Sequence, residues 1–226
     1  MRRHGGRPLA WTAVTNMDGT QLFGRGSLMD YSHLLSTALD ATARDVAGRL
    51  QNWNADNLLD TPAETVVAQL VEKGSVGCPR LLTDQVWQQP DAVEVSHQIV
   101  EFGEPVTRRV KRLVLVVPFE GEMDVFTLRA DTSSLNPPRV LRLNPQELHL
   151  AVDDPPSDGA AIRAKFDEQI AKIEQYLGWS RQQVDAHNQR VRDEVPRMVE
   201  ARCEELRATR NLQAETGYPI RRPDTG

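Results

Sequence analysis

Apolar residues between positions 30 and 75 recur about every 3.6 residues, the spacing of one face of a helix. The first stripe predicts one helix and consists of Leu34, Leu35, Ala38, Leu39, Val46 and Leu50. A second helix is predicted near Thr61, because Thr61 can cap it, Pro62 suits its first position and Glu64 completes a capping box. The N-terminal part of the chain is therefore expected to be helical.

Residues 92–152 change to the alternation of apolar and polar positions that is typical of strands. The segment 106–117 predicts a long strand, and its second half, 113–117, is apolar on both faces. A strand of this kind lies centrally in a sheet, where both of its faces are covered. The predicted strands follow one another too closely for helical crossovers, so the sheet is expected to be mostly antiparallel.

Residues 153–159, DDPPSDG, predict a linker, and residues 160–217 predict a C-terminal arm of two helices. The apolar stripe of the first helix steps by three or four positions and consists of Ile162, Phe166, Ile170, Ile173 and Leu177. Gly178 and Trp179 are expected to break this helix, and Ser180 restarts it with a second capping box.

The second helix of the arm has the spacing of a coiled-coil seam. Its a and d positions, alternately four and three residues apart, are Val184, Asn188, Val191, Val195 and Met198. A polar side chain on a seam fixes register or partner number, which is the role expected of Asn188. His187 is expected beside the seam and half exposed; as a general base it would need a converging nucleophile or second carboxylate, which the sequence does not propose. Pro196 predicts a kink or a break.

These segments predict an α+β fold, with N-terminal helices on a mostly antiparallel sheet followed by a C-terminal two-helix arm. The expected divisions are a disordered leader or mis-assigned start over residues 1–28, an α+β domain over 29–152, the linker over 153–159, the helical arm over 160–217 and a tail over 218–226. The two amphipathic helices must bury their apolar faces against each other, the body or another chain. The interface predicted on them consists of Val184, Asn188, Val191, Val195, Met198, Ile170, Ile173 and Leu177.

Composition narrows the classes of partner. The longest apolar run, residues 113–119, is far shorter than the roughly 20 residues of a membrane-spanning helix. Cys78 and Cys203 lack the spacing of a zinc site, so a reduced, cytoplasmic protein is expected. The chain has a net charge of −5. Residues 1–28, with four Arg and one Asp, carry +3, and residues 160–226, with 12 basic and 11 acidic groups, carry +1. The body, residues 29–159, therefore carries −9. Nucleic acid is an unfavourable partner for so acidic a body.

The densest basic strip outside residues 1–28 is TRRVKR, at residues 107–112. On a strand, Arg109 and Lys111 face one way while Arg108 and Arg112 face the other. A nucleic-acid platform gathers its basic residues on one face with aromatic residues between them, and this strip has none. The strip is therefore expected to be a solvated half of the long strand.

His97 and His149 lie on predicted strands and could meet in space, but two histidines without a third ligand make an incomplete metal site. We predict no catalytic residue, no metal site and no cofactor. The alternative kept open is a metal-dependent hydrolase or nuclease that uses His, Asp and Glu residues of the sheet domain.

Two segments, VVPFEGE at residues 116–122 and YLGWSRQQVDAHNQRV at residues 176–191, resemble those of a class of uncharacterised bacterial proteins. In that class a β-rich domain precedes two long helices that end in a Gly-x-Pro turn, here at Gly217 and Pro219. Similar modules stand beside effector domains in bacterial defence proteins. The resemblance covers residues 90–222, and its motifs are structural, so it implies no active residue.

The function expected is that of a non-enzymatic interaction module in a setting of bacterial defence. It would associate with itself or dock a partner protein through the C-terminal helices. Nucleic-acid sensing through Arg109 and Lys111 is a third hypothesis, which requires salt-dependent binding.

Overall fold

The computed structural model describes residues 19–24, 33–101 and 104–218, with the backbone alone for residues 97–101 and 104–106. The chain divides into two compact units. Among the described residues, unit 1 consists of those up to Ala38 together with Gly77–Val184, and unit 2 consists of Leu39–Val76 and those from Asp185 onwards. Both dividing points fall inside helices, α1 (Leu35–Gln51) and α4 (Gly159–Glu215).

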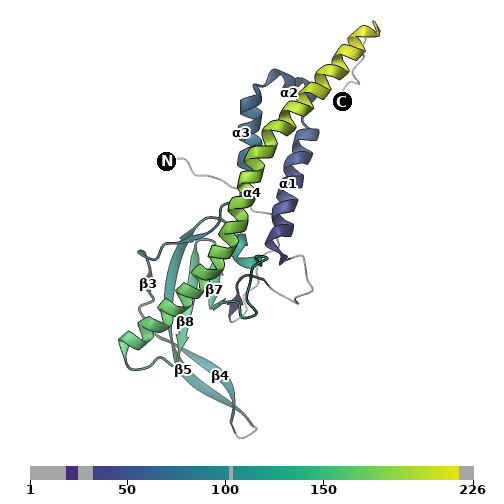
Figure 1. Cartoon of the computed structure of the whole chain (residues 1–226). Coiled ribbons are helices and arrows are strands. Elements are labelled where there is room, and N and C mark those ends of the chain that lie inside the picture. Colours follow the sequence, from purple (N-terminus) through teal and green to yellow (C-terminus); the bar gives the residue numbers. More distant parts are fainter. Residues whose placement is uncertain (1–18, 25–32, 102–103, 219–226) are drawn as a thin grey trace, which may run out of the picture. The chain divides into compact units, whose positions relative to one another are not determined.

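The main sheet of unit 1 is organised around one long strand, β5 (Glu104–Glu120), shown in Figure 1. Its partners on one edge are β2 (Arg80–Leu81), β3 (Trp87–Gln88) and β4 (Val93–Glu101). On the other edge lies β8 (Glu147–Asp153), followed by β7 (Arg142–Asn144). All of these pairings are antiparallel, which confirms the predicted α+β class with an antiparallel sheet.

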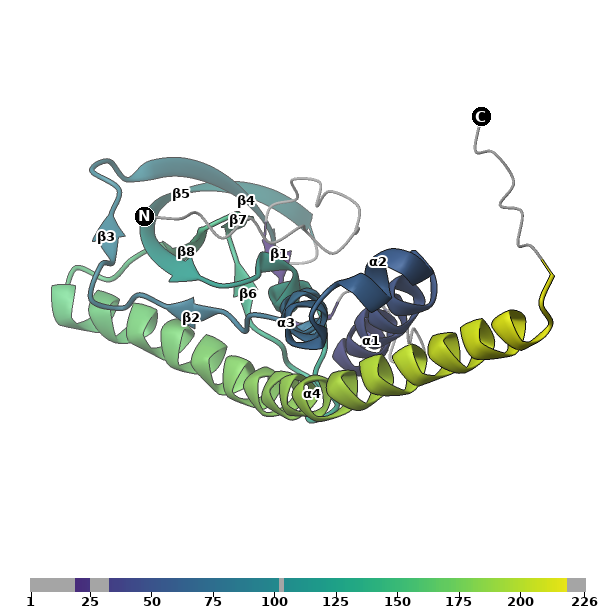
Figure 2. The same cartoon turned by 90° about the horizontal axis from the view of Figure 1, so that it is seen from above.

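The second half of β5 is buried on both faces, as its apolar run predicts. Val117 belongs to the same core as Phe166 and Leu177 of α4, whose first part lies along one side of the sheet (Figure 2). On the opposite face of the strand, Val114 and Val116 are 3% and 0% exposed. The strand is therefore central in the sheet.

Part of the predicted leader is folded into unit 1. Thr20–Gln21 forms β1, which pairs with β6 (Arg139–Val140) in a separate two-stranded sheet. Leu22 and Phe23 follow β1 and lie in the core, at 0% and 2% exposed. Residues 19–24 therefore differ from the disordered segment expected there, and residues 1–18 and 25–28 lie outside the described part of the chain.

The break predicted within the C-terminal arm is wrong, because α4 is a single helix of 57 residues. A glycine inside a helix costs about 1 kcal/mol relative to alanine, which neighbouring side chains can outweigh. Beside Gly178, Leu177 is fully buried, and the ring of Tyr176 packs on that of Trp179 with centroids 4.7 Å apart. Packing on both sides of the glycine therefore carries the helix through the expected stop.

The break predicted at Pro196 is also absent, since α4 continues through it. Proline removes one helical hydrogen bond and leaves the carbonyl four residues earlier without its donor. Pro196 and Arg192 both lie on the exposed side of α4, where solvent can bond to that carbonyl. The proline therefore sits on the side of the helix where its cost is lowest.

Unit 2 is a helical bundle. It is built from α1, α2 (Ala55–Asp60), α3 (Ala63–Gly74) and the second part of α4 (Figure 1). Its buried core consists of Val46, Leu50, Leu58, Val66, Leu70, Val191, Val195, Val199 and Cys203. The N-terminal helices thus share a core with α4; burial against the body of the chain was one of the three possibilities left open for the predicted arm.

The predicted capping box at Thr61 is not formed. The Thr61 hydroxyl donates to the carbonyl of Asn57 at the end of α2, a short helix that the sequence pattern did not indicate. Pro62 occupies the capping position of α3 and makes no side-chain cap bond. The helix predicted there is present, and it begins at Ala63.

Among the described residues, no helix has the length and apolar character needed to cross a membrane.

Candidate interaction surfaces

The apolar residues predicted to form an interface are covered by the chain itself. In unit 1, Ile173 and Leu177 are 1% and 0% exposed in the core, and Ile170 packs against them. Val184, also assigned to unit 1, is 1% exposed. The corresponding residues of unit 2 are Val191 and Val195, which lie in its core, and Met198, which packs against it. These side chains are therefore already in use for packing within each unit.

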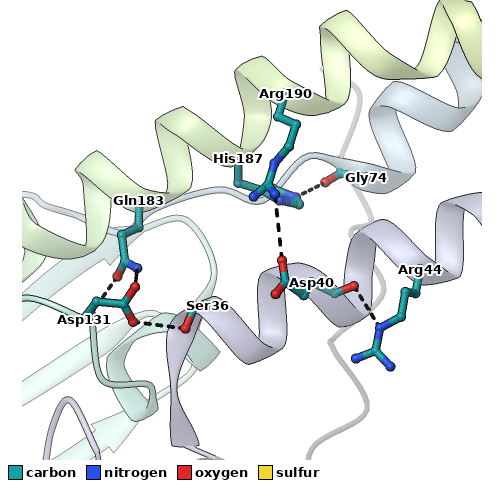
Figure 3. Close-up of polar contacts among 8 residues, drawn as sticks. All are labelled: Ser36, Asp40, Arg44, Gly74, Asp131, Gln183, His187 and Arg190. Carbon is teal, nitrogen blue, oxygen red and sulfur yellow. Dashed lines mark hydrogen bonds and ion pairs between the residues drawn. The ribbon is translucent and has the colours of Figure 1, made fainter.

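His187 is 1% exposed, so the half-exposed position predicted for it is wrong. Its Nε2 lies 2.9 Å from the carbonyl oxygen of Gly74, at the end of α3 (Figure 3). A carbonyl only accepts, so Nε2 carries the proton and donates it. In the neutral ring Nδ1 is then an acceptor, and it is buried with no hydrogen-bond partner among the described residues. His187 therefore lies on the same buried face of α4 as Asn188, which the a and d pattern placed on the seam.

Asn188 holds the segment that follows α3. The N–H of Val76 donates to its Oδ1, and its Nδ2 donates to the carbonyl of Val76, each at 2.9 Å. One side chain therefore satisfies both backbone groups of Val76 as a neighbouring strand would. The polar position of the predicted seam is used inside unit 2, where Asn188 and His187 together fix the end of α3 against α4.

Gly74 is the point where three helices of unit 2 converge. A Cβ at this position would lie 2.9 Å from Cγ1 of Val191 on α4 and 3.0 Å from Cγ2 of Val46 on α1. Only a residue without a side chain allows this approach. The same residue accepts the hydrogen bond from His187, so α3 meets α4 through backbone and side chain together.

Ion pairs reinforce this bundle from its surface. Arg190 lies 4.0 Å from Asp40 of α1, Arg210 pairs with Asp56 of α2, and the Arg202 guanidinium donates to the carbonyl of Gln51. Exposed ion pairs such as the first two contribute about 0–1 kcal/mol each, so the apolar core remains the main source of stability.

Unit 1 has a polar junction around Asp131. The hydroxyl of Ser36 donates to its Oδ1 at 3.0 Å, and the amide of Gln183 donates to its Oδ2 at 2.6 Å (Figure 3). The backbone N–H of Asp131 in turn donates to Oε1 of Gln183 at 3.0 Å. The contacts between Asp131 and Gln183 are reciprocal, and together with the Ser36 bond they fix the loop after Ala130 to α1 and α4 within this unit.

Two carboxyl groups with perturbed pKa values stand near the turn at Gly121. Glu122 accepts the N–H of Gly77 at 2.9 Å. Burial raises the pKa of Glu122 above its ordinary value of 4.5, the Gly77 bond lowers it, and the charge of Asp124 raises it again. Burial likewise raises the pKa of Asp124, in the short helix η2 (Met123–Thr127).

Within the described residues, no group of three or more His, Cys, Asp and Glu side chains could hold a metal ion.

Replacing Glu122 by glutamine is expected to stabilise the chain more at pH 7 than at pH 4. With its pKa raised on folding, Glu122 binds more protons in the folded state, so its contribution to stability falls as pH rises above about 4.5. Glutamine keeps an acceptor for Gly77 and has no charge. Urea unfolding at both pH values measures the difference, with exposed Glu168→Gln as the control. An equal effect of Glu122→Gln at the two pH values would contradict the expectation.

The two strand histidines do not meet. His97 pairs with Arg108 of β5, and His149 pairs with Val116 of the same strand. Eight residues of strand separate these positions by about 26 Å. The imidazole of His149 instead contacts Asn144 and Glu147, at 3.1 and 3.3 Å from its Nε2. These two histidines therefore form no common site for the hydrolase alternative, and the side chain of His97 lies outside the described part.

Two apolar side chains are exposed on the strands β3 and β4, which pair with β5. Val93 is 47% exposed and Trp87 46%, far above the core residues of the same sheet. Their partners on β5 are Arg112 and Val116, an even number of residues apart, so both side chains lie on one face. Sequence periodicity did not predict the exposure of Val93 and Trp87. An alternating strand predicts that one of its faces is covered, but it does not identify apolar residues that stay exposed.

Comparison with protein-family models, with curated proteins and with solved structures finds no match to this chain.

Proposed function

We propose that this chain is a non-enzymatic protein-interaction module that docks a partner protein through the ribbon formed by β4 and the first half of β5. We call residues 93–101 and 104–112 the β4–β5 ribbon. Figure 1 shows it extending past the end of β8. The observation that carries the proposal is the exposure of Val93 on this ribbon and of Trp87 on the adjoining strand β3.

The ribbon has the properties of a docking surface. Val95 and Val110 face each other on the same side as Val93 and are partly exposed, which extends the apolar face along both strands. The outer edge of β4 pairs with no described strand, and an open edge is a template for another chain. Two strands alone are marginally stable in water, so a partner that covers this face would also stabilise it.

The C-terminal helix α4 has a different part in this proposal from the interface that its apolar pattern predicts. Its apolar seam supports the two units from within, and the ribbon takes the role of the interface. The resemblance to modules of bacterial defence proteins would place such a partner beside an effector, and we include this setting in the proposal.

The test is photo-crosslinking in the cells from which the sequence comes. With a diazirine amino acid at position 93, we expect an adduct with one second protein, and its yield should fall when Trp87 is replaced by serine. A crosslinker at Leu135, which is 86% exposed in the same unit, is the matched control. Adducts only with a second copy of the chain, or the same adducts from position 135, would contradict docking of a partner through the ribbon.

A further inference from the structure

One edge of β5 is left open where β8 ends. The last pair between these strands is Arg112 with Asp153, and the N–H of Asp154 then donates to the carbonyl of Lys111 at 2.9 Å. Asp154 has a positive φ of 47°, and Pro155 follows, so the chain turns away from the strand. Beyond this point no described residue pairs with that edge of β5.

The backbone groups at the open edge can be identified from the alternation of the strand. Lys111 bonds towards the β8 side, as does Phe119, whose N–H donates to Gln146. Val114 bonds towards the β3 side, where it accepts from Gln89. Odd-numbered residues of β5 therefore present their N–H and C=O groups to the β8 side. Continued past the end of β8, the rule leaves Thr107 and Arg109 with outward groups that no described strand uses.

The side chains along this edge are basic, and the chain already pairs two of them with acids. The guanidinium of Arg112 donates to both carboxylate oxygens of Asp153, at 2.6 and 2.8 Å, and Arg108 lies 3.4 Å from Asp154. Arg109 and Lys111 point to the other face, with Ser96 and Glu94 opposite them on β4. Two consecutive acidic residues at the end of β8 thus already lie against this basic strip.

We propose that the open edge of β5 at residues 107–110 accepts an extended acidic segment of the partner protein as an added strand. The proposal rests on the function proposed above and names the chemistry of the partner. Thr107 and Arg109 would supply the ladder bonds, and acidic side chains on one face of the added strand would meet Arg109 and Lys111. Charge favours an acidic occupant, because Arg109 and Lys111 are cationic and lie on one face of the strand beside this edge.

The experiment measures binding of short synthetic peptides to the full chain by fluorescence anisotropy. The probe is a capped peptide of alternating valine and glutamate, which places all its acids on one face of a strand. A peptide of alternating valine and lysine and an oligothymidylate are the comparison probes. We expect the acidic peptide to bind and the basic peptide to bind at least about tenfold more weakly, since like charges then meet across the strands.

Two variants separate strand addition from attraction by charge alone. Thr107→Pro removes one outward N–H and leaves the ladder with β4 intact, because proline is tolerated where the N–H faces the open edge. We expect this variant to bind the acidic peptide about tenfold more weakly than the wild type does. The double variant Arg109→Glu with Lys111→Glu should weaken binding by a similar factor. Arg163→Glu, an exposed site on α4, is the matched charge control and should leave binding unchanged. Circular dichroism of each variant confirms that it is folded.

Several outcomes would overturn the proposal. Equal binding of the acidic and basic peptides, or loss of binding with the charge variants but none with Thr107→Pro, would exclude an added acidic strand. Binding of oligothymidylate without binding of the peptide would assign the strip to nucleic acid. If no peptide binds while the crosslink from position 93 is found, the partner docks on the apolar face, and the proposed function stands without this edge.

Discussion

Replacing His187 by alanine is expected to lower the free energy of unfolding by about 3 kcal/mol, within the range of large-to-small changes in a core. The change removes the hydrogen bond to the Gly74 carbonyl and leaves a cavity where the imidazole is now 1% exposed. Leaving that carbonyl without its donor adds to the loss. Urea unfolding of the full chain, followed by helical circular dichroism, measures the effect.

Two further variants distinguish the hydrogen bond from the volume. His187→Gln retains a donor on a side chain of similar reach, and we expect it to lose less stability than alanine. Gln189→Ala changes an exposed residue two positions away and should alter stability by no more than about 0.5 kcal/mol. An alanine variant as stable as the wild type would show that the contact between His187 and α3 contributes nothing.

Replacing Gly74 by alanine is expected to destabilise the chain by about 2 kcal/mol, although alanine is the better helix former. The added Cβ would meet the methyl groups of Val191 and Val46 at 2.9 and 3.0 Å. Both are stiff β-branched side chains on neighbouring helices, so neither can rotate away freely. Relief must come from separation of α3 from α1 and α4.

Gly48 provides the matched control, because it also lies in a helix of unit 2 and a Cβ there would have no neighbour within 4 Å. Gly48→Ala is expected to stabilise the chain by about 0.5–1 kcal/mol through helix propensity alone. Adding Val191→Ala to Gly74→Ala should cost less than Val191→Ala costs in the wild type, since it removes the clash. Stabilisation by both glycine substitutions would contradict the convergence of three helices at Gly74.

The sequence predicted those elements whose apolar pattern is sustained. The apolar run at residues 113–117 identified the central strand, and the stripe through Ile173 and Leu177 identified a buried helix face. The spacing of Val191 and Val195 likewise marked residues that are buried, because periodicity reports which face of a helix is covered. It does not report whether the covering side chains belong to the same chain, and here they come from segments more than 100 residues earlier.

Local signals misled where tertiary packing opposed them. Gly178 and Pro196 are helix-breaking residues, yet α4 passes through both, because the first is flanked by the buried Leu177 and by two packed rings, and the second is exposed to solvent. The position of His187 depends on the end of α3, which no pattern in its own helix could indicate. The exposure of Val93 and Trp87 depends on what covers that face of the assembled sheet, which the alternation of a single strand does not report.

The most direct test of where a partner docks is to compare photo-crosslinking from two positions in the full chain under the same conditions. The diazirine amino acid is placed at position 93 on the β4–β5 ribbon in one sample and at position 198 on the predicted helical seam in the other. We expect adducts with a second protein from position 93 and only adducts within the chain from position 198, where Met198 packs against the core of unit 2. Adducts with another chain from position 198 and none from position 93 would contradict the proposal and return the interface to the C-terminal helix.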